Sequence, residues 1–193
     1  MPIQSWHETK QSSKAAGTLF NTFTTAKSVI NATDLYSVRA GTLYVGKIFR
    51  VYAIGALSNI ITTPGTVVFQ VMMGTLAAPI IAFTTGTIQL NATAHILLPF
   101  WLEVILRVDS IGSGTAAKFM GMGRVSGIQP TLTAGQVDAV NTPGIFSAPA
   151  TAPALGVGFD STIDNVMDFW TGFSISNAGN GVQVQVYAAD ELN

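Results

Sequence analysis

The sequence predicts an all-β protein, an antiparallel jelly-roll-like β-sandwich with an extended N-terminal arm. Three segments alternate apolar and polar side chains, at residues 49–53, 67–71 and 102–108. Because the side chains of a strand point alternately to opposite faces, each segment can bury one face and expose the other. Residues that favour tight turns lie between these segments, at 63–66, 85–86 and 112–115. No stretch indicates a helix longer than a turn or two.

Residues 1–40 are predicted to hold the arm and the first strands. Large apolar residues are sparse at the start, where Ile3 and Trp6 stand among polar residues. We therefore interpret residues 1–16 as an arm that becomes ordered on docking. Two short strands are expected to follow, at residues 18–25 and 29–36.

Residues 41–193 form the predicted sandwich. Its strands are expected at residues 43–45, 48–57, 66–73, 82–85, 87–90, 96–109 and 116–125. In the longest of them Glu103 and Arg107 share one face, which is therefore the outward face. In the last, Gly121 and Gly123 share one face, which indicates a bend or a close approach of the backbone.

The alternation stops between residues 129 and 159, where four prolines are interleaved with small residues. A loop of this length in a compact domain is usually functional or disordered, and its apolar groups place this one on a surface. Two further strands are expected at residues 167–175 and 182–188. The turn between them, at residues 177–181, predicts that these two strands form a hairpin.

The composition indicates a chain whose surface is covered by partners. Charged residues make up 10% of the 193 residues and apolar residues 48%, whereas about a quarter of a typical soluble domain is charged. Cysteine is absent, which excludes disulfides and thiolate metal sites. The first ten residues lack the features of a signal peptide. Residues 96–108, the most apolar run, fall short of the about 20 residues of a membrane-spanning helix, so no membrane partner is expected.

The charges are unevenly distributed along the chain. The net charge of −1 argues against nucleic-acid binding by phosphate neutralisation. The first fifty residues contain six basic and two acidic residues, whereas residues 151–193 contain five acidic residues and no basic one. Either the two blocks are solvated parts of one domain, or the basic block reaches an acidic surface on another chain.

The sequence contains no motif for catalysis or metal binding. His7 and His95 are the only histidines, and isolated histidines are mostly polar rim or core residues. Asp160, Asp164 and Asp168 recur at every fourth residue but lack the ligand spacing of a calcium loop, so we interpret them as turn and strand-entry residues. We expect no enzyme activity, no cofactor and no metal site.

Four stretches follow one another in a distinctive order: residues 42–55 (TLYVGKIFRVYAIG), residues 63–71 (TPGTVVFQV), the strand 101–108 with its turn at 112–115, and residues 158–165 (GFDSTIDN). This order resembles that of the jelly-roll-like modules of tailed-phage virion proteins, which occur in head decoration (cement) proteins, head fibres and tail fibres. The resemblance covers residues 41–193 and implies a homotrimer. The arm and the proline-rich excursion at 129–159 depart from it.

The resemblance implies a structural protein of the virion. The first hypothesis is a capsid decoration protein that binds the outer surface of the phage head and stabilises the lattice of its partner, the major capsid protein. The alternative is a receptor-binding tip module of a head fibre or tail fibre. A fibre would place a heptad repeat or a shaft before the module, and residues 1–40 show no heptad pattern.

Seven residues are predicted to lie at a capsid or subunit interface: Ile3, Trp6, Lys10, Lys14, Met120, Met122 and Trp170. Trp6 is the expected anchor of the arm, because tryptophan often dominates interface energies. Alternatively, the arm lies on its own trimer, exchanged between subunits. Trp101 and Trp170 have apolar neighbours, which places them in the core or at a subunit contact rather than in a sugar-binding platform.

Overall fold

The computed structural model describes residues 7–17, 19–60, 65–90, 94–127, 145–148 and 154–192. These residues form strands and one 3₁₀ turn, η1 (Ala32–Asp34), so the predicted all-β class is confirmed. The strands are β1 (His7–Ser12), β2 (Phe20–Asn21), β3 (Lys27–Ser28), β4 (Tyr36–Val38), β5 (Ile48–Asn59), β6 (Thr66–Thr75), β7 (Ala78–Thr84), β8 (Ile88–Gln89), β9 (His95–Ser110), β10 (Lys118–Ser126), β11 (Ile145–Ala148), β12 (Ala154–Leu155), β13 (Asn165–Phe173) and β14 (Gly181–Leu192). Within these ranges no helix has the length and apolar character needed to cross a membrane.

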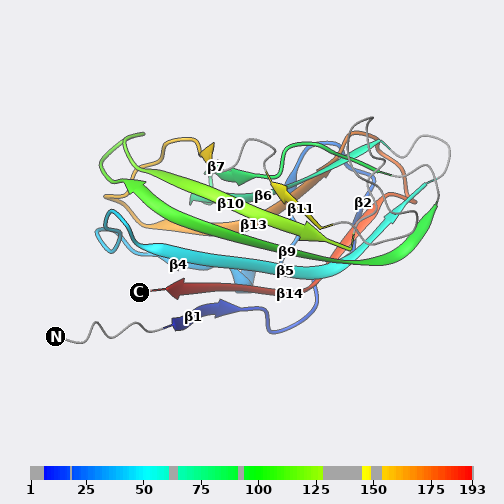
Figure 1. Ribbon diagram of the computed structural model, residues 1–193, viewed down its shortest axis with the longest axis horizontal. Coiled ribbons are helices and arrows are strands. Elements are labelled where there is room, and N and C mark those ends of the chain that lie inside the picture. The colour runs from blue at the N-terminus through cyan, green and yellow to red at the C-terminus, as the bar shows by residue number, and fades with distance from the viewer. Residues whose placement is uncertain are drawn as a thin grey trace.

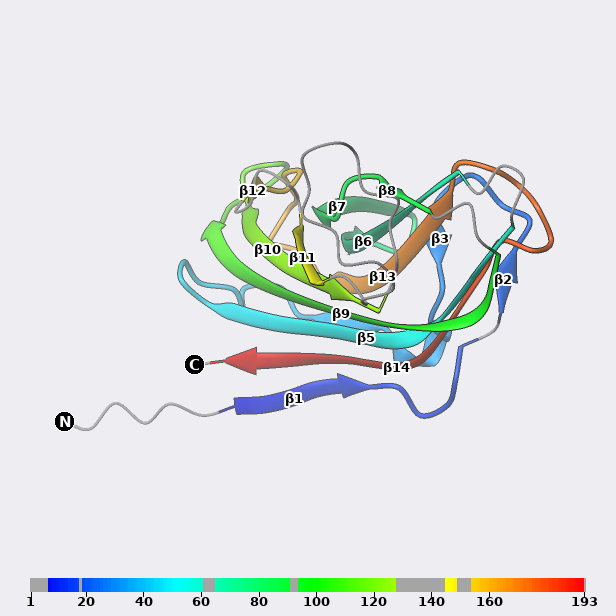
Figure 2. The same ribbon diagram turned by 45° about the vertical axis from the view of Figure 1, so that its right-hand side comes forward.

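The strands form two antiparallel sheets that pack face to face as a sandwich (Figures 1 and 2). The large sheet has the order β1-β14-β5-β9-β10-β11, with β2 also beside β14 and β12 beside β10. The small sheet has the order β3-β13-β6-β7, with β4 also beside β13 and β8 beside β6. This is the predicted jelly-roll-like sandwich.

The predicted alternation decides which side chains form the core. In β5 the odd-numbered residues are buried and the even-numbered ones half-buried. In β9 the even-numbered residues from Phe100 to Val108 are buried, while Glu103 and Arg107 point outward as expected. The buried faces of both sheets meet in one apolar core, whose largest members include Tyr187, Phe49, Phe69, Phe100, Phe119, Phe169 and Phe173. Full burial of one such side chain contributes about 1.5–3 kcal/mol to folding.

Two glycines on the buried face of β10 allow the small sheet to come close. A Cβ atom at Gly121 would lie 2.9 Å from Cδ2 of Phe83 in β7, and one at Gly123 would lie 3.0 Å from its Cζ. The Phe83 ring therefore occupies the space that side chains at these two positions would need. The predicted close approach of the backbone is confirmed at Gly123, where a Cβ atom would lie 2.9 Å from the carbonyl oxygen of Glu103, whereas at Gly121 the groups that come close are side chains.

The predicted hairpin between the last two strands is wrong. Strand β13 pairs with β6 in the small sheet, with Phe169 opposite Val71. Strand β14 pairs with β5 in the large sheet, with Tyr187 opposite Ala53. The residues between them therefore carry the chain from one sheet to the other. A local turn signal shows where the chain reverses, but the pairing partner of the next strand is decided by long-range packing.

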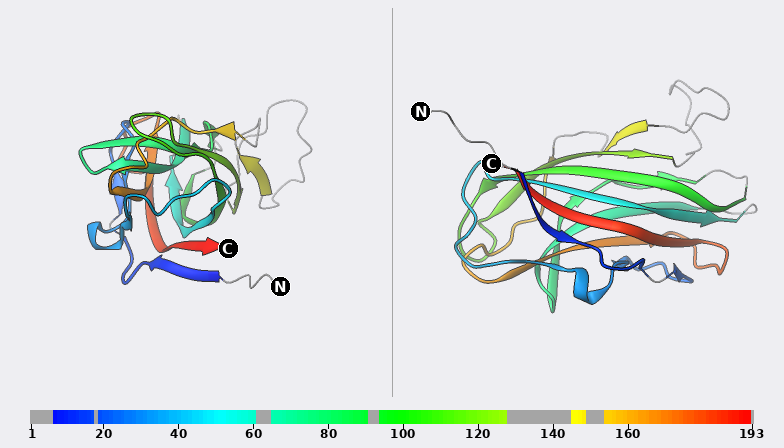
Figure 3. Two further views of the ribbon diagram at one scale, coloured as in Figure 1. Left: turned by 90° about the vertical axis from the view of Figure 1, so that its left-hand side faces the viewer. Right: turned by 90° about the horizontal axis from the view of Figure 1, so that it is seen from below.

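The N-terminal segment runs along the edge of the large sheet. Strand β1 pairs with β14, and Figure 3 shows the two strands, dark blue and red, side by side in both views. Residues 7–12 of the predicted arm thus form an edge strand of the same chain, whereas Ile3 and Trp6 lie outside the described residues. The strands predicted at 18–25 and 29–36 are wrong in extent, because only β2 and the first residue of β4 fall within them. The 3₁₀ turn η1 interrupts the second stretch.

The two charge blocks of the sequence meet within one chain. The Nζ of Lys47 lies 2.8 Å from Oε1 of Glu191, and both side chains are buried. The Nζ of Lys10 lies 3.6 Å from Oε2 of the same carboxylate. His7 Nε2 lies 2.8 Å from Oδ2 of Asp190. These contacts arise because β1 and β5 flank β14.

Two segments cross from one sheet to the other along the sides of the sandwich. On one side the amide of Gly156 donates to a carbonyl of β10 at 2.9 Å, and the amide of Val157 donates to a carbonyl of β7 at 2.8 Å. On the other side the amide of Gly17 donates to β14 at 2.7 Å, and that of Val29 donates to β13 at 3.1 Å. Each segment satisfies backbone groups of both sheets, which ties the sheets together. The proline-rich excursion is described only at 145–148 and 154–159.

Candidate functional site

The candidate site is the outer face of the large sheet, meaning the side chains of β5, β9, β10 and β14 that point away from the core. The strand registers place Ile54 opposite Trp101, and Arg50 opposite Ile105. Ile105 in turn lies opposite Met122 of β10. The central residues of this outer face are Arg50, Ile54, Trp101, Glu103, Ile105, Arg107, Met122 and Arg124.

Large apolar side chains on the outer face are open to solvent. Trp101 is 44% exposed and Met122 49% exposed. Ile105 is 36% exposed, and Val186 of β14 is also exposed opposite the half-buried Ile54. Contiguous exposed apolar groups of this kind mark interaction surfaces.

An ion-pair cluster stands in the middle of the outer face. Oε1 of Glu103 lies 2.8 Å from Nε of Arg50. Its Oε2 accepts from Nε of Arg124 at 2.7 Å and lies 2.6 Å from Nη2 of the same guanidinium. One carboxylate is thus shared by two guanidinium groups, and both nitrogens of Arg124 that face it contact the same oxygen, Oε2. The guanidinium of Arg50 also lies 5.6 Å from the ring centre of Tyr52.

These side chains are suited to binding another macromolecule. Arginine, tryptophan and methionine are the residue types that are enriched at protein–protein interfaces. In the part of the chain that the structure describes, no group of three or more histidine or acidic side chains is arranged to hold a metal ion. The outer face therefore offers guanidinium donors and exposed apolar area, two features that protein–protein interfaces use.

Of the five predicted interface residues that the structure describes, it brings two together. Met120 and Met122 both lie on β10 and point away from the core, and the sulfur of Met120 lies 3.6 Å from Nη2 of Arg107. Lys10 stands at the edge of the large sheet beside Glu191, and Lys14 is exposed beyond β1. Trp170 lies on the small sheet. Ile3 and Trp6 lie outside the described residues.

Trp101 belongs to the site although it is not one of the seven predicted interface residues. Two places were expected for Trp101, the core or a subunit contact. The core is excluded, because Trp101 is 44% exposed on the outer face, whereas the subunit contact stays a prediction. The signal was present in the alternation of β9: Trp101 has the same parity as Glu103 and Arg107, which had already been placed on the outward face. The contact of Glu103 with Arg50 and Arg124 needed the strand registers, which no local pattern provides.

The three regularly spaced aspartates have different roles. Oδ1 of Asp160 accepts from the amide of Thr162 at 2.8 Å and from its hydroxyl at 2.6 Å, and these bonds lower the pKa of the carboxyl. Oδ1 of Asp164 accepts from the amide of Ala40 at 2.8 Å. Both are turn residues, as predicted. The same expectation is wrong for Asp168, because this residue lies inside β13 and not at the start of the strand.

Asp168 and Trp170 form a small polar cluster on the small sheet. The indole Nε1 of Trp170 donates to Oδ2 of Asp168 at 2.6 Å, and the hydroxyl of Ser28 donates to Oδ1 at 2.9 Å. Burial of Asp168 raises the pKa of its carboxyl, and the hydrogen bonds offset part of this effect. The indole of Trp170 is therefore hydrogen-bonded within its own sheet.

Replacing Asp168 with asparagine is expected to change how stability depends on pH. Because the folded carboxyl has a raised pKa, the folded state binds the proton more tightly than the unfolded state. The contribution of the Asp168 carboxyl to the free energy of unfolding is therefore complete below the usual aspartate pKa, about 4. This contribution is lost as pH rises through the pKa of the carboxyl in the folded state. The stability of the wild type minus that of Asp168→Asn should be larger at pH 4 than at pH 7, as measured by urea unfolding.

Asp160→Asn is the matched control for this measurement. The pKa of Asp160 is lowered in the folded state, so its contribution is present above the unfolded pKa and lost as pH falls. The difference from wild type should therefore shrink toward low pH, opposite to Asp168→Asn. A pH-independent difference for Asp168→Asn would contradict the assignment.

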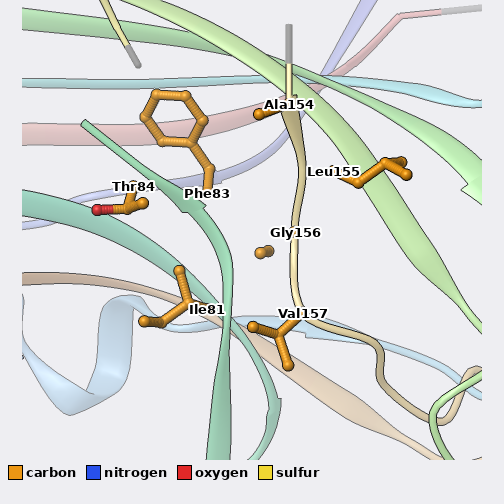
Figure 4. A pocket seen from close by; sticks show the side chains of 8 residues that line it. Ile81, Phe83, Thr84, Ala154, Leu155, Gly156 and Val157 are labelled. Carbon is orange, nitrogen blue, oxygen red and sulfur yellow. The ribbon is translucent and has the colours of Figure 1, made fainter. Parts of the chain in front are cut away.

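The pockets among the described residues are poor candidates for a ligand site. One of about 180 Å³ lies between β7 and residues 154–157, and apolar side chains such as Ile81, Phe83 and Val157 surround it (Figure 4). This volume is below the about 300–1,000 Å³ of typical small-molecule sites. A wider one of about 450 Å³ lies between end loops. There the hydroxyl of Ser161 is already bonded to the backbone of Gly112.

Comparisons with known proteins give a fold likeness only. No protein-family model and no curated protein matches the chain. The CBM2 module of the evolved Dit of Lactobacillus casei BL23 phage J-1 is 10% identical, with a TM-score of 0.40 over 99% of this chain and 98% of that chain. Arcelin-5, a lectin-like defence protein of Phaseolus vulgaris, is 7% identical, with a TM-score of 0.41 over 97% of both chains. The acidic lectin of winged bean, complexed with methyl-α-D-galactose, is 10% identical, with a TM-score of 0.36 over 98% of this chain and 99% of that chain.

Proposed function

We propose that this chain is a structural protein of a phage virion, a capsid decoration protein that binds the outer surface of the head. Its partners are further copies of itself, in a homotrimer, and the major capsid protein, whose lattice it stabilises. We propose no catalytic role for it. The proposal joins the sequence resemblance of residues 41–193 to virion modules with the outer face of the large sheet.

The outer face is the single observation that supports this proposal best. Trp101, Ile105 and Met122 expose apolar area around the guanidinium of Arg124. Binding such a face to a partner would remove the exposed apolar area from water, at about 25 cal/mol per Å² before the costs of association. A decoration protein needs a broad adhesive surface of this kind.

A second candidate function is a receptor-binding module of a head fibre or tail fibre. It is favoured by the exposure of Trp101, because an indole face open to solvent can stack on a sugar ring. The two functions differ in copy number. A decoration protein covers the lattice, whereas fibre tips occur in small numbers at defined places.

The copy number of the chain in purified virions tests the proposal. We expect quantitative mass spectrometry to find the chain in proportion to the major capsid protein, and cryo-electron microscopy to place it at regular lattice positions on the head. The reference within each sample is the portal protein, which is present in few copies. A copy number comparable with that of the portal protein would instead support the fibre module.

A further inference from the structure

We propose that the outer face of the large sheet docks on an acidic protein surface, one that presents carboxylates among apolar side chains, and not on a second copy of itself. This inference rests on the proposed function, because it assigns the docking surface for the capsid and the chemistry of the surface that it meets. The docking element is then the outer face of the large sheet, and not the N-terminal arm that was expected from the sequence.

Each arginine of the outer face is more exposed than the acid that it pairs with. The side chain of Arg124 is 62% exposed, whereas that of its partner Glu103 is 14% exposed. Arg107 is 50% exposed and its partner Asp109 is 32% exposed. Lys118 of β10 is also exposed. A partner that approaches this face therefore meets guanidinium and ammonium groups first.

The guanidinium groups keep donors for a partner. Glu103 has two carboxylate oxygens, and they are shared between Arg50 and Arg124. An arginine has five N–H donors, and Arg124 directs its Nε and Nη2 toward Glu103. Its remaining donors can form a charge-assisted bond with a carboxylate of another protein.

The same distribution of charge disfavours a second copy as the occupant. Two copies of this face would bring exposed cations toward exposed cations, while the acids that could neutralise them are less exposed and already pair with their own arginines. Opposed like charges cost several kcal/mol in an interface. An acidic partner meets no such repulsion, and the trimer contacts therefore lie on other surfaces of the sandwich.

The apolar part of the face favours a protein over a glycan. Ile105, Met122 and Val186 are aliphatic side chains, which offer a sugar neither a flat ring nor hydrogen bonds. Trp101 is the aromatic residue among the large exposed side chains of β9 in the described range. Aliphatic groups beside arginine complement a protein surface of mixed apolar and acidic character.

The test is binding of the full chain to phage heads that were assembled without it, at low and high salt. Arg124→Glu should weaken binding about tenfold or more, and the affinity of this variant should depend less steeply on salt than that of the wild type. Arg124→Gln removes the charge without adding a carboxylate beside Glu103, and should also weaken binding. Arg39→Glu is the matched control, because Arg39 is exposed outside the large sheet and undergoes the same charge change. Circular dichroism confirms that each variant is folded.

A zero-length carbodiimide cross-linker gives an independent readout of the partner. We expect Lys118 to be joined to a carboxylate of the major capsid protein. Three results would each overturn the inference and leave the proposed function standing. They are a link from Lys118 to a second copy of this chain, a loss of trimer mass in Arg124→Glu, and unchanged binding of both Arg124 variants. The inference would also be overturned if an acidic polysaccharide inhibited head binding at constant ionic strength and Lys118 formed no cross-link to the major capsid protein. Failure of the wild-type chain to bind heads at any salt concentration would refute the proposed function, and the inference with it.

Discussion

Replacing Phe69 with alanine is expected to lower the free energy of unfolding by about 3–5 kcal/mol. Phe69 is fully buried in β6, and its ring centre lies 5.0 Å from that of Phe100 in the large sheet and 5.9 Å from that of Phe169 in β13. Alanine would leave a cavity where the two sheets meet and would remove both ring contacts. Since small domains are stable by only about 5–15 kcal/mol, this is a large share of the total.

Urea unfolding followed by tryptophan fluorescence measures this loss. Phe69→Leu keeps most of the volume and should cost clearly less. Leu76→Ala is the exposed control, because Leu76 is 71% exposed at the turn between β6 and β7, and it should change stability by less than about 0.5 kcal/mol. A loss for Phe69→Ala as small as that of the control would mean that Phe69 does not hold the sheets together.

Removing the carboxylate of Glu191 is expected to cost about 3 kcal/mol or more. Glu191→Gln would leave the ammonium of Lys47 buried without its charged partner at 2.8 Å. Lys47 would keep a bond to the carbonyl of Thr42 at 3.1 Å, and its Nζ would remain 5.5 Å from the ring centre of Tyr44. These contacts do not replace a carboxylate, because a buried charge without a counter-charge loses most of its hydration energy.

A double-mutant cycle separates the cost of an unpaired charge from the worth of the pair. Lys47→Met with Glu191→Met replaces both charges by apolar groups, and the double variant should be more stable than the sum of the two single losses predicts. Because the pair is buried, the coupling should change little between low and high salt. Strictly additive losses would show that the two charges do not interact in the folded state.

The strands that the sequence predicted well are those whose two faces differ. β5 alternates throughout and β9 from Phe100 to Val108, since one face meets the core and the other does not, and their bounds were expected to within two residues. β13 is covered on both faces for most of its length, so its alternation could not reveal which sheet contains it. The hairpin was predicted wrongly for this reason. Asn180 and Gly181 allow the chain to reverse whether the next strand joins the same sheet or the other sheet.

The candidate site was less predictable than the fold. Met120 and Met122 were expected at an interface because apolar residues occupy both faces of β10. The cluster at Glu103, by contrast, depends on the register of three strands that are far apart in the sequence. A shift of one residue in β10 would turn Arg124 to the other face. The sequence pattern therefore placed Glu103 and Arg107 on the outward face of β9 but could not show which residues of β5 and β10 lie beside them.

The pairing of β1 with β14 has a mechanical consequence. His7 lies opposite Leu192, so both ends of the described chain leave the large sheet at the same corner (Figure 1). A force that pulls these ends apart loads the hydrogen bonds one rung at a time, from His7 toward Ser12, like opening a zipper. Such a geometry yields at low force, because the bonds do not share the load as they do in shear. β5 and β9 have strands on both sides, so β1 would peel off first while the outer face of β5, β9 and β10 stays intact.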